Sequence, residues 1–472
     1  MLNRFLFTKI DNSPLIIFRI FFGLLVASEC YGAILTGWIR RTLIEPKFTF
    51  SFIGFEWLQP LPGNGMYFYF FIMGSMGILI ALGYKYRYSM IAFTLLWTGV
   101  YLMQKTSYNN HYYLLILISA MMCLFPAHRR HSLDVRQNPA LKTDAMYAWV
   151  KWTIILQLLI VYVYAAIAKL YGDWLDFGIV RILMLGKVNF YLVGDLLQQP
   201  WVHKIIGTVG ILFDLLIIPA LLYKQTRKIA FVISIFFHLF NSFIFQIGIF
   251  PYLSLAFTVF FFEPETIRTI FFKKKKPYRL TMVEAPSYKP ILYVIGGLYF
   301  LVQLALPLRQ HFIKDNVLWT EEGHRMSWRM MLRNRSGTIE FKVVEKESGT
   351  TKIITIDDYL SKKQRRRIAA YPDFIWQFAQ HLKKEYAEKG IPISVYAINS
   401  RVSINGRPTR AFIDPKVDLA TAKWDYFRHN DWILPSQLSS STKTNSHINK
   451  PDSKRSAPQS ASEANDDTKV DP

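Results

Sequence analysis

The feature that most constrains this chain is a series of apolar runs that extends from near the N-terminus to about Leu308. Most of these runs are about 16 to 23 residues long, and a helix of about 20 apolar residues crosses the roughly 30 Å hydrocarbon core of a bilayer. Backbone polar groups find no water in that core, so a spanning segment satisfies them internally as a helix. The runs therefore predict a polytopic α-helical membrane protein embedded in a lipid bilayer.

Nine segments qualify as candidate spans, so we expect about nine transmembrane helices in a bundle over residues 1–308. The segments cover residues 14–36, 66–82, 88–104, 111–126, 149–168, 207–223, 229–248, 250–262 and 291–308. The segment 250–262 is short for a full crossing and has Pro251 at its start. It is predicted to be tilted or re-entrant.

Positive charge in this chain indicates an orientation in the membrane and does not favour a nucleic acid partner. The formal net charge is +23, but much of the excess lies in short loops beside the spans. With the N-terminus inside, the inside connections hold eighteen Lys and Arg residues and the outside connections hold eight. Because Lys and Arg are retained on the cytoplasmic side, we expect a cytoplasmic N-terminus. Nine crossings then make everything after Leu308 extracytoplasmic.

After the last span, the pattern changes to that of a smaller, soluble α+β domain, predicted over residues 309–438. The predicted elements are strands at 337–344 and 351–356 with a turn at Gly349-Thr350, a helical region from Asp357 to Lys389 ended by Gly390, and strands at 392–396 and 401–404. Asn405-Gly406 is a hairpin signal. Residues 439–472 are polar with almost no large apolar side chains, which predicts a disordered tail.

A polar island, residues 104–114, separates the third and fourth predicted spans. Lys105 ends one apolar run and His111 opens the next, with Asn109 and Asn110 between them. A lysine at a span end commonly extends toward the headgroups, but this loop holds more hydrogen-bonding groups than its length needs. Lys105 is therefore also a candidate base, provided that burial or a neighbouring positive charge lowers its pKa from about 10.4.

Other polar residues lie within or beside the apolar runs. His238 is in the middle of one run, with Asn241 on the same predicted helical face. Such residues usually face the bundle interior, so His238 is either functional or structural. Asp214 is predicted to pair with a cation or to be protonated. Lys169 and Trp174, just after the fifth span, are interpreted as interfacial anchors. The spacing of possible ligands predicts no metal site.

Six motifs follow one another along the chain. They are Phe18-Arg-Ile-Phe-Phe-Gly, Lys105-Thr-Ser-Tyr-Asn-Asn-His-Tyr-Tyr-Leu, His128-Arg-Arg, Ile160-Val-Tyr through Ala168-Lys-Leu-Tyr-Gly-Asp-Trp, Phe237-His-Leu-Phe-Asn-Ser through Gly248-Ile-Phe-Pro-Tyr, and Trp319-Thr-Glu-Glu-Gly-His-Arg-Met-Ser-Trp. In this order, over about residues 14–335, the chain resembles the vitamin K-dependent gamma-glutamyl carboxylase family.

That resemblance implies an enzyme that oxidises vitamin K hydroquinone, or a menaquinol-type hydroquinone, to its epoxide with O2. The γ proton of glutamate is too weakly acidic for a Lys or His to remove, and this oxidation generates a base strong enough to do so. A glutamate in a protein or peptide substrate then takes up CO2 to become gamma-carboxyglutamate. A dry site in the membrane would protect such a base from water.

The resemblance also implies roles for residues of the motifs. Lys105 matches the family's lysine base, which deprotonates the hydroquinone. His238 matches a functionally important histidine, and Tyr252 matches a tyrosine in the region associated with glutamate and hydroquinone binding. The remaining candidates for binding or orienting the hydroquinone, or for stabilising its oxyanion, are Asn109, Asn110, His111 and Asn241.

The soluble domain departs from the family pattern. Animal members are longer and join a larger lumenal part to the membrane part by a disulfide, whereas the two cysteines here, Cys30 and Cys123, both lie in apolar runs. The departure leaves the protein substrate open and favours a bacterial inner membrane over the endoplasmic reticulum. Two alternatives remain: a related quinol-oxidising membrane enzyme that does not carboxylate, and a non-catalytic transporter or lipid-binding protein.

Overall fold

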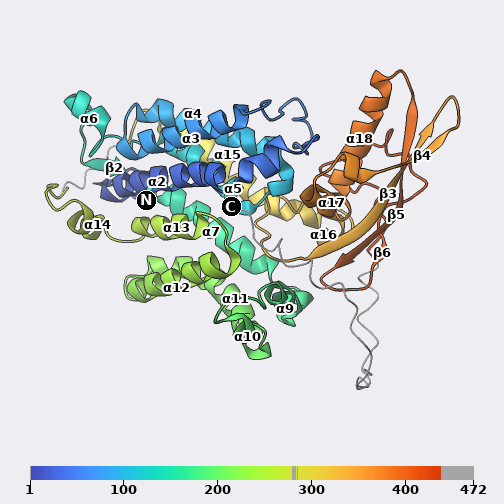
Figure 1. Cartoon of the computed structure of the whole chain (residues 1–472). Coiled ribbons are helices and arrows are strands. Elements are labelled where there is room, and N and C mark those ends of the chain that lie inside the picture. Colours follow the sequence, from blue (N-terminus) through green and yellow to red (C-terminus); the bar gives the residue numbers. More distant parts are fainter. Residues whose placement is uncertain (1, 279–282, 284, 437–472) are drawn as a thin grey trace.

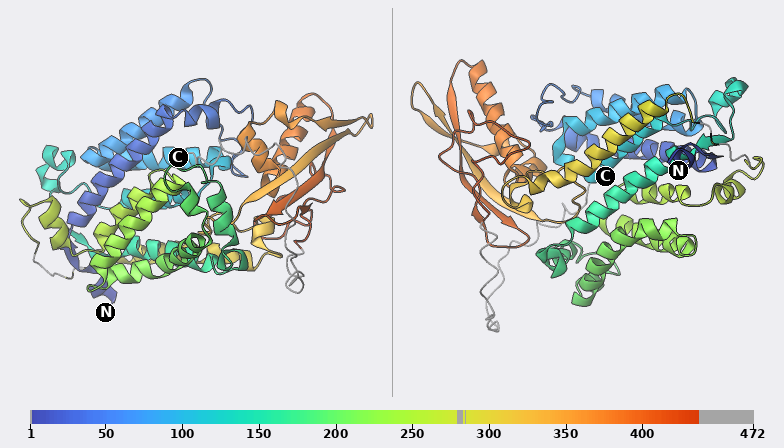
Figure 2. Two further views of the ribbon diagram at one scale, coloured as in Figure 1. Left: turned by 60° about the horizontal axis from the view of Figure 1, so that its bottom comes forward. Right: turned by 180° about the vertical axis from the view of Figure 1, so that it is seen from behind.

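The computed structural model describes residues 2–278, 283 and 285–436, and it has two parts (Figure 1). The first is a bundle of helices, and the second is a smaller domain built on a β-sheet. Figure 2 shows this domain at one end of the bundle in two further views. The predicted disordered tail, residues 439–472, lies outside the described residues.

Each of the nine predicted spans falls on helical structure. The helices are α2 (Ser13–Leu35), α3 (Gly65–Leu82), α4 (Tyr86–Met103), α5 (Asn110–Leu124), α7 (Ala148–Ala168), α11 (Pro200–Leu222), α12 (Arg227–Phe245), α13 (Phe250–Phe257) with the 3₁₀ turn η4 (Thr258–Phe260), and α15 (Lys289–Leu308). The prediction of a membrane-helical class is therefore consistent with the structure.

The count of nine spans is not confirmed. Among the described residues, six helices are long and apolar enough to cross a membrane, namely α2, α3, α7, α11, α12 and α15. The helix α4 is outside this set, and its first turn carries the polar residues Tyr86, Arg87 and Tyr88. Both α5 and the segment Phe250–Phe260 are shorter apolar helices.

Shorter elements connect these helices. They are α1 (Leu2–Phe7), β1 (Lys9–Asp11), the π-helical turn η1 (Arg40–Ile44), η2 (Lys105–Ser107), α6 (Leu133–Gln137), η3 (Pro139–Leu141), β2 (Ala145–Tyr147), α8 (Gly172–Leu175), α9 (Gly178–Leu185), α10 (Gly194–Leu197), α14 (Pro264–Phe271), η5 (Arg309–His311) and α16 (Val317–Thr320). The strands β1 and β2 pair antiparallel near the N-terminus.

Close packing of α2 on α3 depends on two glycines. A Cβ atom added to Gly23 would lie 2.4 Å from the backbone nitrogen of Ala81, and one added to Gly77 would lie 2.8 Å from the backbone nitrogen of Ala27. Small residues at a helix crossing let the two backbones approach, and this packing holds helices together in lipid. The first motif thus contributes a packing surface to the bundle.

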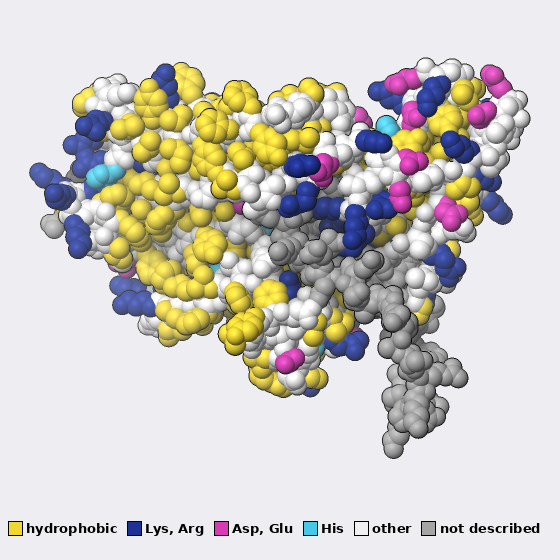
Figure 3. All heavy atoms as spheres, viewed as in Figure 1, with side chains coloured by type: hydrophobic (Ala, Val, Ile, Leu, Met, Phe, Trp, Pro, Cys, Tyr) yellow, Lys and Arg dark blue, Asp and Glu magenta, His cyan; other side chains and the backbone are white. Residues whose placement is uncertain are grey.

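The connections that were predicted to be cytoplasmic contact one another. Lys275 Nζ lies 2.6 Å from an Asp11 carboxylate oxygen, and the backbone nitrogen of Lys85 donates to Asp134 at 2.6 Å. The N-terminus, α6 and α14 lie at the end of the bundle away from the soluble domain (Figure 1). Figure 3 shows Lys and Arg side chains gathered at this end, with hydrophobic side chains covering much of the bundle between it and the domain.

The first and third motifs meet at this end of the bundle through Arg19. Its guanidinium is 1% exposed and donates to backbone carbonyl groups. The acceptors are Ala81 at 3.2 Å, Ala127 at 2.9 Å, Arg130 at 3.3 Å and His131 at 2.6 Å. Arg19 therefore joins α2 to the loop that carries His128-Arg-Arg.

The soluble domain is a four-stranded antiparallel sheet with two helices. Its strands are β3 (Arg335–Glu345), β4 (Thr351–Ile354), β5 (Ile393–Ile404) and β6 (Arg410–Ala411), in the spatial order β4-β3-β5-β6, and its helical elements are η6 (Ile356–Asp358), α17 (Lys362–Ile368) and α18 (Pro372–Glu388). The apolar side of α18, which carries Phe374, Ile375, Phe378 and Leu382, is buried as its spacing predicts.

Two predicted elements of this domain differ from the structure. The strands predicted at 392–396 and 401–404 are one strand, β5, because a bulge opposite Thr338 and Glu340 absorbs the polar residues between them. The helix predicted from Asp357 to Lys389 is interrupted, because the residue before Pro372 is disfavoured in helical conformation. Pro372 instead begins α18, where its missing N–H is tolerated.

The loop between α2 and α3 attaches the bundle to the soluble domain. Phe50 from this loop is buried in the apolar core of the domain beside Phe374, with ring centroids 4.7 Å apart. Gln377 of α18 donates its side-chain amide to the Ser51 carbonyl at 2.9 Å. The domain core therefore includes residues of the membrane part, which fixes the position of α18 over the polar island.

Candidate functional site

A large cavity lies where helices of the bundle meet the segment that leads into the soluble domain. Its volume is about 1430 Å³, and its wall includes residues of α5, α9, α11, α12 and the segment 324–334. Much of the wall is apolar, with side chains such as Ile205, Val209 and Phe236. Cavities of this kind, apolar with a few converging polar groups, are typical ligand sites.

The polar island contributes its second half to this cavity. Asn109 caps α5 by accepting a hydrogen bond from the Tyr112 backbone nitrogen at 2.7 Å. Asn110 donates its side-chain amide to the Arg329 carbonyl at 3.1 Å and accepts from the Tyr108 hydroxyl at 2.9 Å. The loop has more hydrogen-bonding groups than its length needs, and these bonds account for part of that number. They hold the segment after α15 against the start of α5.

Two histidines from different motifs lie in the cavity wall. His111 stacks on Phe250 with ring centroids 3.8 Å apart, and the His238 ring is nearly perpendicular to the same ring with centroids 6.5 Å apart. The Nε2 atom of His238 lies 3.3 Å from the Tyr162 hydroxyl. The structure thus brings together His111, His238 and the predicted binding residues Asn109, Asn110 and Asn241, all of which line the cavity.

Two predicted site residues lie elsewhere. Lys105 is absent from the cavity lining. Tyr252 is also absent from the lining, and its side chain is largely exposed, with its hydroxyl 3.1 Å from the Ser242 hydroxyl. The motif that contains Tyr252 still contributes to the site, because the rings of both histidines contact Phe250.

Lys105 is buried at the junction between the bundle and the soluble domain. Its Nζ atom lies 2.6 Å from a carboxylate oxygen of Asp373, and the two side chains are 1% and 2% exposed. Arg325 binds the same carboxylate with contacts of 2.7 and 3.2 Å. The Lys105 ammonium also lies 4.9 Å from the centre of the Phe374 ring. Lys105 is therefore not extended toward solvent as a headgroup anchor would be.

Opposing electrostatic effects act on this cluster. Burial, opposed by the Asp373 carboxylate and assisted by Arg325, lowers the pKa of Lys105 to about 8. Burial alone would raise the pKa of Asp373, but the positive charges of Arg325 and Lys105 outweigh it and hold that pKa at about 2. Asp373 is therefore ionised at neutral pH, whereas the Lys105 ammonium can release its proton near neutral pH.

Tyr108 connects the Lys105 cluster to the cavity. Its side chain lines the cavity, and its hydroxyl accepts a hydrogen bond from the Met326 backbone nitrogen at 2.7 Å. The guanidinium of Arg325 lies 5.8 Å from the centre of the same ring. Trp328, two residues beyond Met326, stacks on Tyr113 with ring centroids 5.0 Å apart. The last motif is thereby packed along the polar island.

A buried ion pair lies in another part of the cavity wall. Lys169 Nζ is 2.5 Å from an Asp214 carboxylate oxygen, and it also donates to the Ala165 carbonyl at 3.3 Å. The interpretation of Lys169 as an interfacial anchor is wrong, because its side chain is buried against α11. The prediction that Asp214 pairs with a cation is confirmed.

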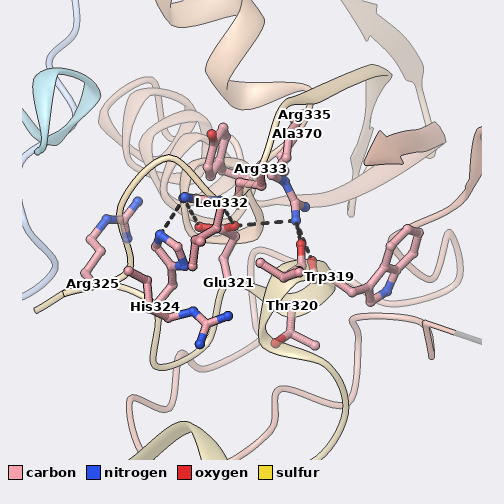
Figure 4. A network of polar contacts seen from close by, with 12 residues as sticks. Trp319, Thr320, Glu321, His324, Arg325, Leu332, Arg333, Arg335 and Ala370 are labelled. Atoms are coloured by element: carbon pink, nitrogen blue, oxygen red, sulfur yellow. Dashed lines mark hydrogen bonds and ion pairs between the residues drawn. The ribbon is translucent and has the colours of Figure 1, made fainter. Parts of the chain in front are cut away.

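Sequence reasoning missed the charged residues of the segment after α15 and of α18. Figure 4 shows Glu321 beside Arg333 and Arg335, with His324 on the other side of Arg333. Arg333 contacts a Glu321 oxygen at 2.5 Å and His324 Nε2 at 2.5 Å. The motif Trp319 to Trp328 was the available signal for Glu321 and His324. For Asp373 the sequence offers only a helix N-terminus, where an acidic residue is common.

The geometry defines a class of protein: a helical membrane bundle that carries a soluble domain at one end, with a largely apolar cavity near their junction into which a few polar groups converge. Two family sequence models match the chain. One, described as the HTTM domain, matches residues 7–265, and the other, described as the lumenal domain of vitamin K-dependent gamma-carboxylase, matches residues 288–439. No solved structure matches the chain.

The chain belongs to the vitamin K-dependent gamma-carboxylase family, because the first match covers more than half of it and the second covers the soluble domain. The resemblance inferred from the six motifs is confirmed. The chain is thus a carboxylase-like membrane protein. The description of the second family as a lumenal domain suggests that the soluble part is extracytoplasmic.

Proposed function

We propose that this protein is an integral membrane carboxylase that couples oxidation of a vitamin K-type hydroquinone to carboxylation of glutamate in a protein or peptide. The observation that carries the proposal is the cavity of about 1430 Å³ in which Asn109 and His111 from one family motif converge with His238 from another. Family membership supplies the reaction class. The cavity in the membrane part is the site that we propose for it.

The cavity fits a hydroquinone with an isoprenoid tail. Apolar side chains of α11 and α12, including Ile205, Val209 and Phe236, suit the tail, and the polar wall near His111 and His238 suits the ring hydroxyl groups. When bound, the hydroquinone supplies, with O2, the strong base that removal of a glutamate γ proton requires. The chain's own residues bind the reactants, orient them and exclude water.

In this proposal Lys105 holds and releases a proton at its Nζ atom. Because the pKa of Lys105 is about 8, roughly a tenth of the side chains are neutral at pH 7. A neutral amine is no longer attracted to the Asp373 carboxylate as an ammonium is, so loss of the proton also weakens the ion pair. The proposal therefore requires the neutral side chain to leave Asp373 and reach the cavity past Tyr108.

The cavity histidines have a different role. His111 and His238 flank Phe250, and the hydrogen bonds of Asn109 and Asn110 fix the start of α5. Fixed donors and acceptors of this kind orient a bound ring and stabilise charge that develops on its oxygen atoms. We assign His111 and His238 to binding and orientation of the hydroquinone.

The direct test is an assay of the purified full-length protein in lipid with reduced vitamin K, labelled bicarbonate and a peptide that contains glutamate. We expect epoxide and labelled gamma-carboxyglutamate. Epoxide without labelled peptide would favour the quinol-oxidising alternative instead. Failure of a well-folded preparation to form either product with vitamin K and menaquinol-type hydroquinones would contradict the proposal.

Replacement of Lys105 with alanine tests its role within the proposed reaction. We expect Lys105→Ala to lose epoxide formation while remaining folded, because Arg325 still pairs with Asp373. Lys47→Ala is the matched control, since Lys47 is an exposed lysine that contacts the soluble domain through the Asp358 carbonyl. Full epoxide formation by Lys105→Ala would assign the proton to another group.

A further inference from the structure

One charged side chain in the cavity wall, that of Arg329, has a nitrogen atom without a hydrogen-bond partner among the described residues. The Arg329 side chain is 9% exposed and lines the cavity, and its Nε atom has no hydrogen-bond partner among the described residues. A guanidinium is always charged at physiological pH, and a buried charge without a counter-charge costs several kcal/mol. A buried positive charge with an unpartnered N–H group in a cavity wall suits an anionic ligand.

The Glu321 carboxylate, which acts electrostatically on Arg329, is already engaged. Glu321 contacts Arg333 at 2.5 Å and lies 3.5 Å from Arg335. Arg329 thus lies beside a pair of arginines that share one carboxylate. Burial, assisted by the neighbouring charge of Arg333 and opposed by the Glu321 carboxylate, lowers the pKa of Arg329 to about 10.

The charge of the whole cavity wall also favours an anionic ligand. Lysine and arginine contribute five side chains to the lining and aspartate contributes one; these are Lys169, Lys187, Arg329, Arg333, Arg367 and Asp214. The Asp214 carboxylate is bound by Lys169 at 2.5 Å. An excess of positive charge in a low-dielectric cavity favours entry of an anion.

The position of Arg329 is fixed relative to the polar island. Its carbonyl group accepts the Asn110 side-chain amide at 3.1 Å, and Asn110 is the first residue of α5, one position before His111. His324 lies in the same wall and is 2% exposed, with Nδ1 lacking a partner in the described part of the chain. The backbone of Arg329 is thereby anchored, and its planar guanidinium can bind a carboxylate through two parallel hydrogen bonds.

We propose that Arg329 binds the side-chain carboxylate of the acidic residue that enters the cavity for reaction. This inference rests on the proposed function and deepens it by naming the group that holds the peptide substrate. A carboxylate anchored at Arg329 fixes the adjacent γ carbon in the cavity near His111. Its positive charge also favours the extra negative charge that the side chain acquires when that carbon loses its proton.

The test uses the full-length protein in lipid and two peptides that differ only by glutamate or glutamine at the reactive position. We expect Arg329→Gln to raise the KM for the glutamate peptide, and the Kd measured by fluorescence, by about ten- to a hundredfold. The KM for the hydroquinone stays unchanged. Arg329→Lys retains the charge without the bidentate geometry and is expected to lie between Arg329→Gln and the parent protein.

Arg181→Gln is the matched control. Arg181 is exposed on α9, a helix whose neighbouring residues line the cavity, and it is absent from the lining itself. The Arg181→Gln substitution removes the same charge close to the site. It is expected to change neither the KM nor the Kd for the glutamate peptide. Thermal unfolding of each variant shows whether it is folded. If Arg329→Gln does not fold, the comparison of Arg329→Lys with the parent protein decides the inference.

Several outcomes would overturn the inference about Arg329 without contradicting the proposed function. These are carboxylation by Arg329→Gln with an unchanged peptide KM, equal affinity of the parent protein for the glutamate and glutamine peptides, and loss in Arg329→Gln of bicarbonate or inorganic phosphate binding alone. Conversely, glutamate-specific binding that depends on Arg329 in a protein that forms no carboxyglutamate would uphold the carboxylate site and contradict the proposed reaction.

Discussion

At the residue scale, the pKa of Lys105 in the membrane part depends on a carboxylate of the soluble domain, that of Asp373. Asp373 raises the pKa of Lys105 and burial lowers it, with a net value of about 8. A base accepts a proton only when it is neutral, so epoxide formation that depends on Lys105 is expected to rise with pH through about 8. Asp373→Asn removes the raising effect, and the rising limb is expected to move to lower pH.

The measurement is the pH dependence of epoxide formation by the parent protein and by Asp373→Asn. Asp358→Asn, an exposed residue of η6, is the matched control and is expected to keep the parent profile. A limb that stays in place, or one that moves to higher pH, would show that Asp373 does not set the protonation of the group that we propose as the base.

A second prediction at this scale concerns the buried pair of Lys169 and Asp214. Removal of one partner leaves an uncompensated charge in the bundle, which typically costs about 3–5 kcal/mol, whereas replacement of both by apolar residues is often neutral. We expect Lys169→Met and Asp214→Leu each to lower thermal stability in detergent. The double variant is expected to recover most of the loss, and additive losses would contradict a direct interaction.

The sequence identified the residue Lys105 but not its environment. The polar island marks Lys105, Asn109 and His111 as unusual because they gather several hydrogen-bonding groups between two apolar runs. Its partner Asp373 lies in a domain of ordinary α+β pattern, where an acid at a helix N-terminus carries no distinctive signal. Long-range ion pairs of this kind follow from the tertiary arrangement, which local periodicity does not encode.

At the scale of elements, the apolar runs predicted the positions of the membrane helices well. The ends of the helices and strands in the soluble domain were predicted less well. The runs of apolar residues are long, and their length and hydropathy together leave few alternatives to helix. In the soluble domain, the bulge in β5 broke the two-residue alternation, so one strand read as two. Alternation carries the register of a strand only where pairing is regular.

The contact between α2 and α3 gives a prediction at this scale. Gly23→Ala places a Cβ atom 2.4 Å from the Ala81 backbone, which cannot move without shifting α3. Overpacking of this kind commonly costs about 1–3 kcal/mol. We expect a lower unfolding temperature in detergent, with Gly32→Ala of the same helix as control, since a Cβ atom there meets nothing within 4 Å. Equal stability of the two variants would contradict the close approach.

At the scale of the whole molecule, the two ends of the bundle differ in charge and in partners. The end that carries the N-terminus, α6 and α14 is basic and is held by pairs such as Lys275 with Asp11. The other end carries the soluble domain, attached through Phe50 and through the cluster of Lys105 and Asp373. Since Lys and Arg are retained on the cytoplasmic side, we predict that the basic end faces the cytoplasm.

Cysteine labelling of a chain with Cys30 and Cys123 replaced by alanine tests this orientation. We expect a membrane-impermeant maleimide to label Ser348→Cys, in the exposed turn between β3 and β4, in right-side-out vesicles, and Gln137→Cys, at the end of α6, only in inside-out vesicles. Labelling after detergent treatment shows that both sites are reactive. Labelling of both positions from the same side would mean that an odd number of spans does not separate them. Labelling in the reversed sense would place the soluble domain and the nearby end of the cavity on the cytoplasmic side, so that the proposed substrate would be a cytoplasmic protein and not an exported one.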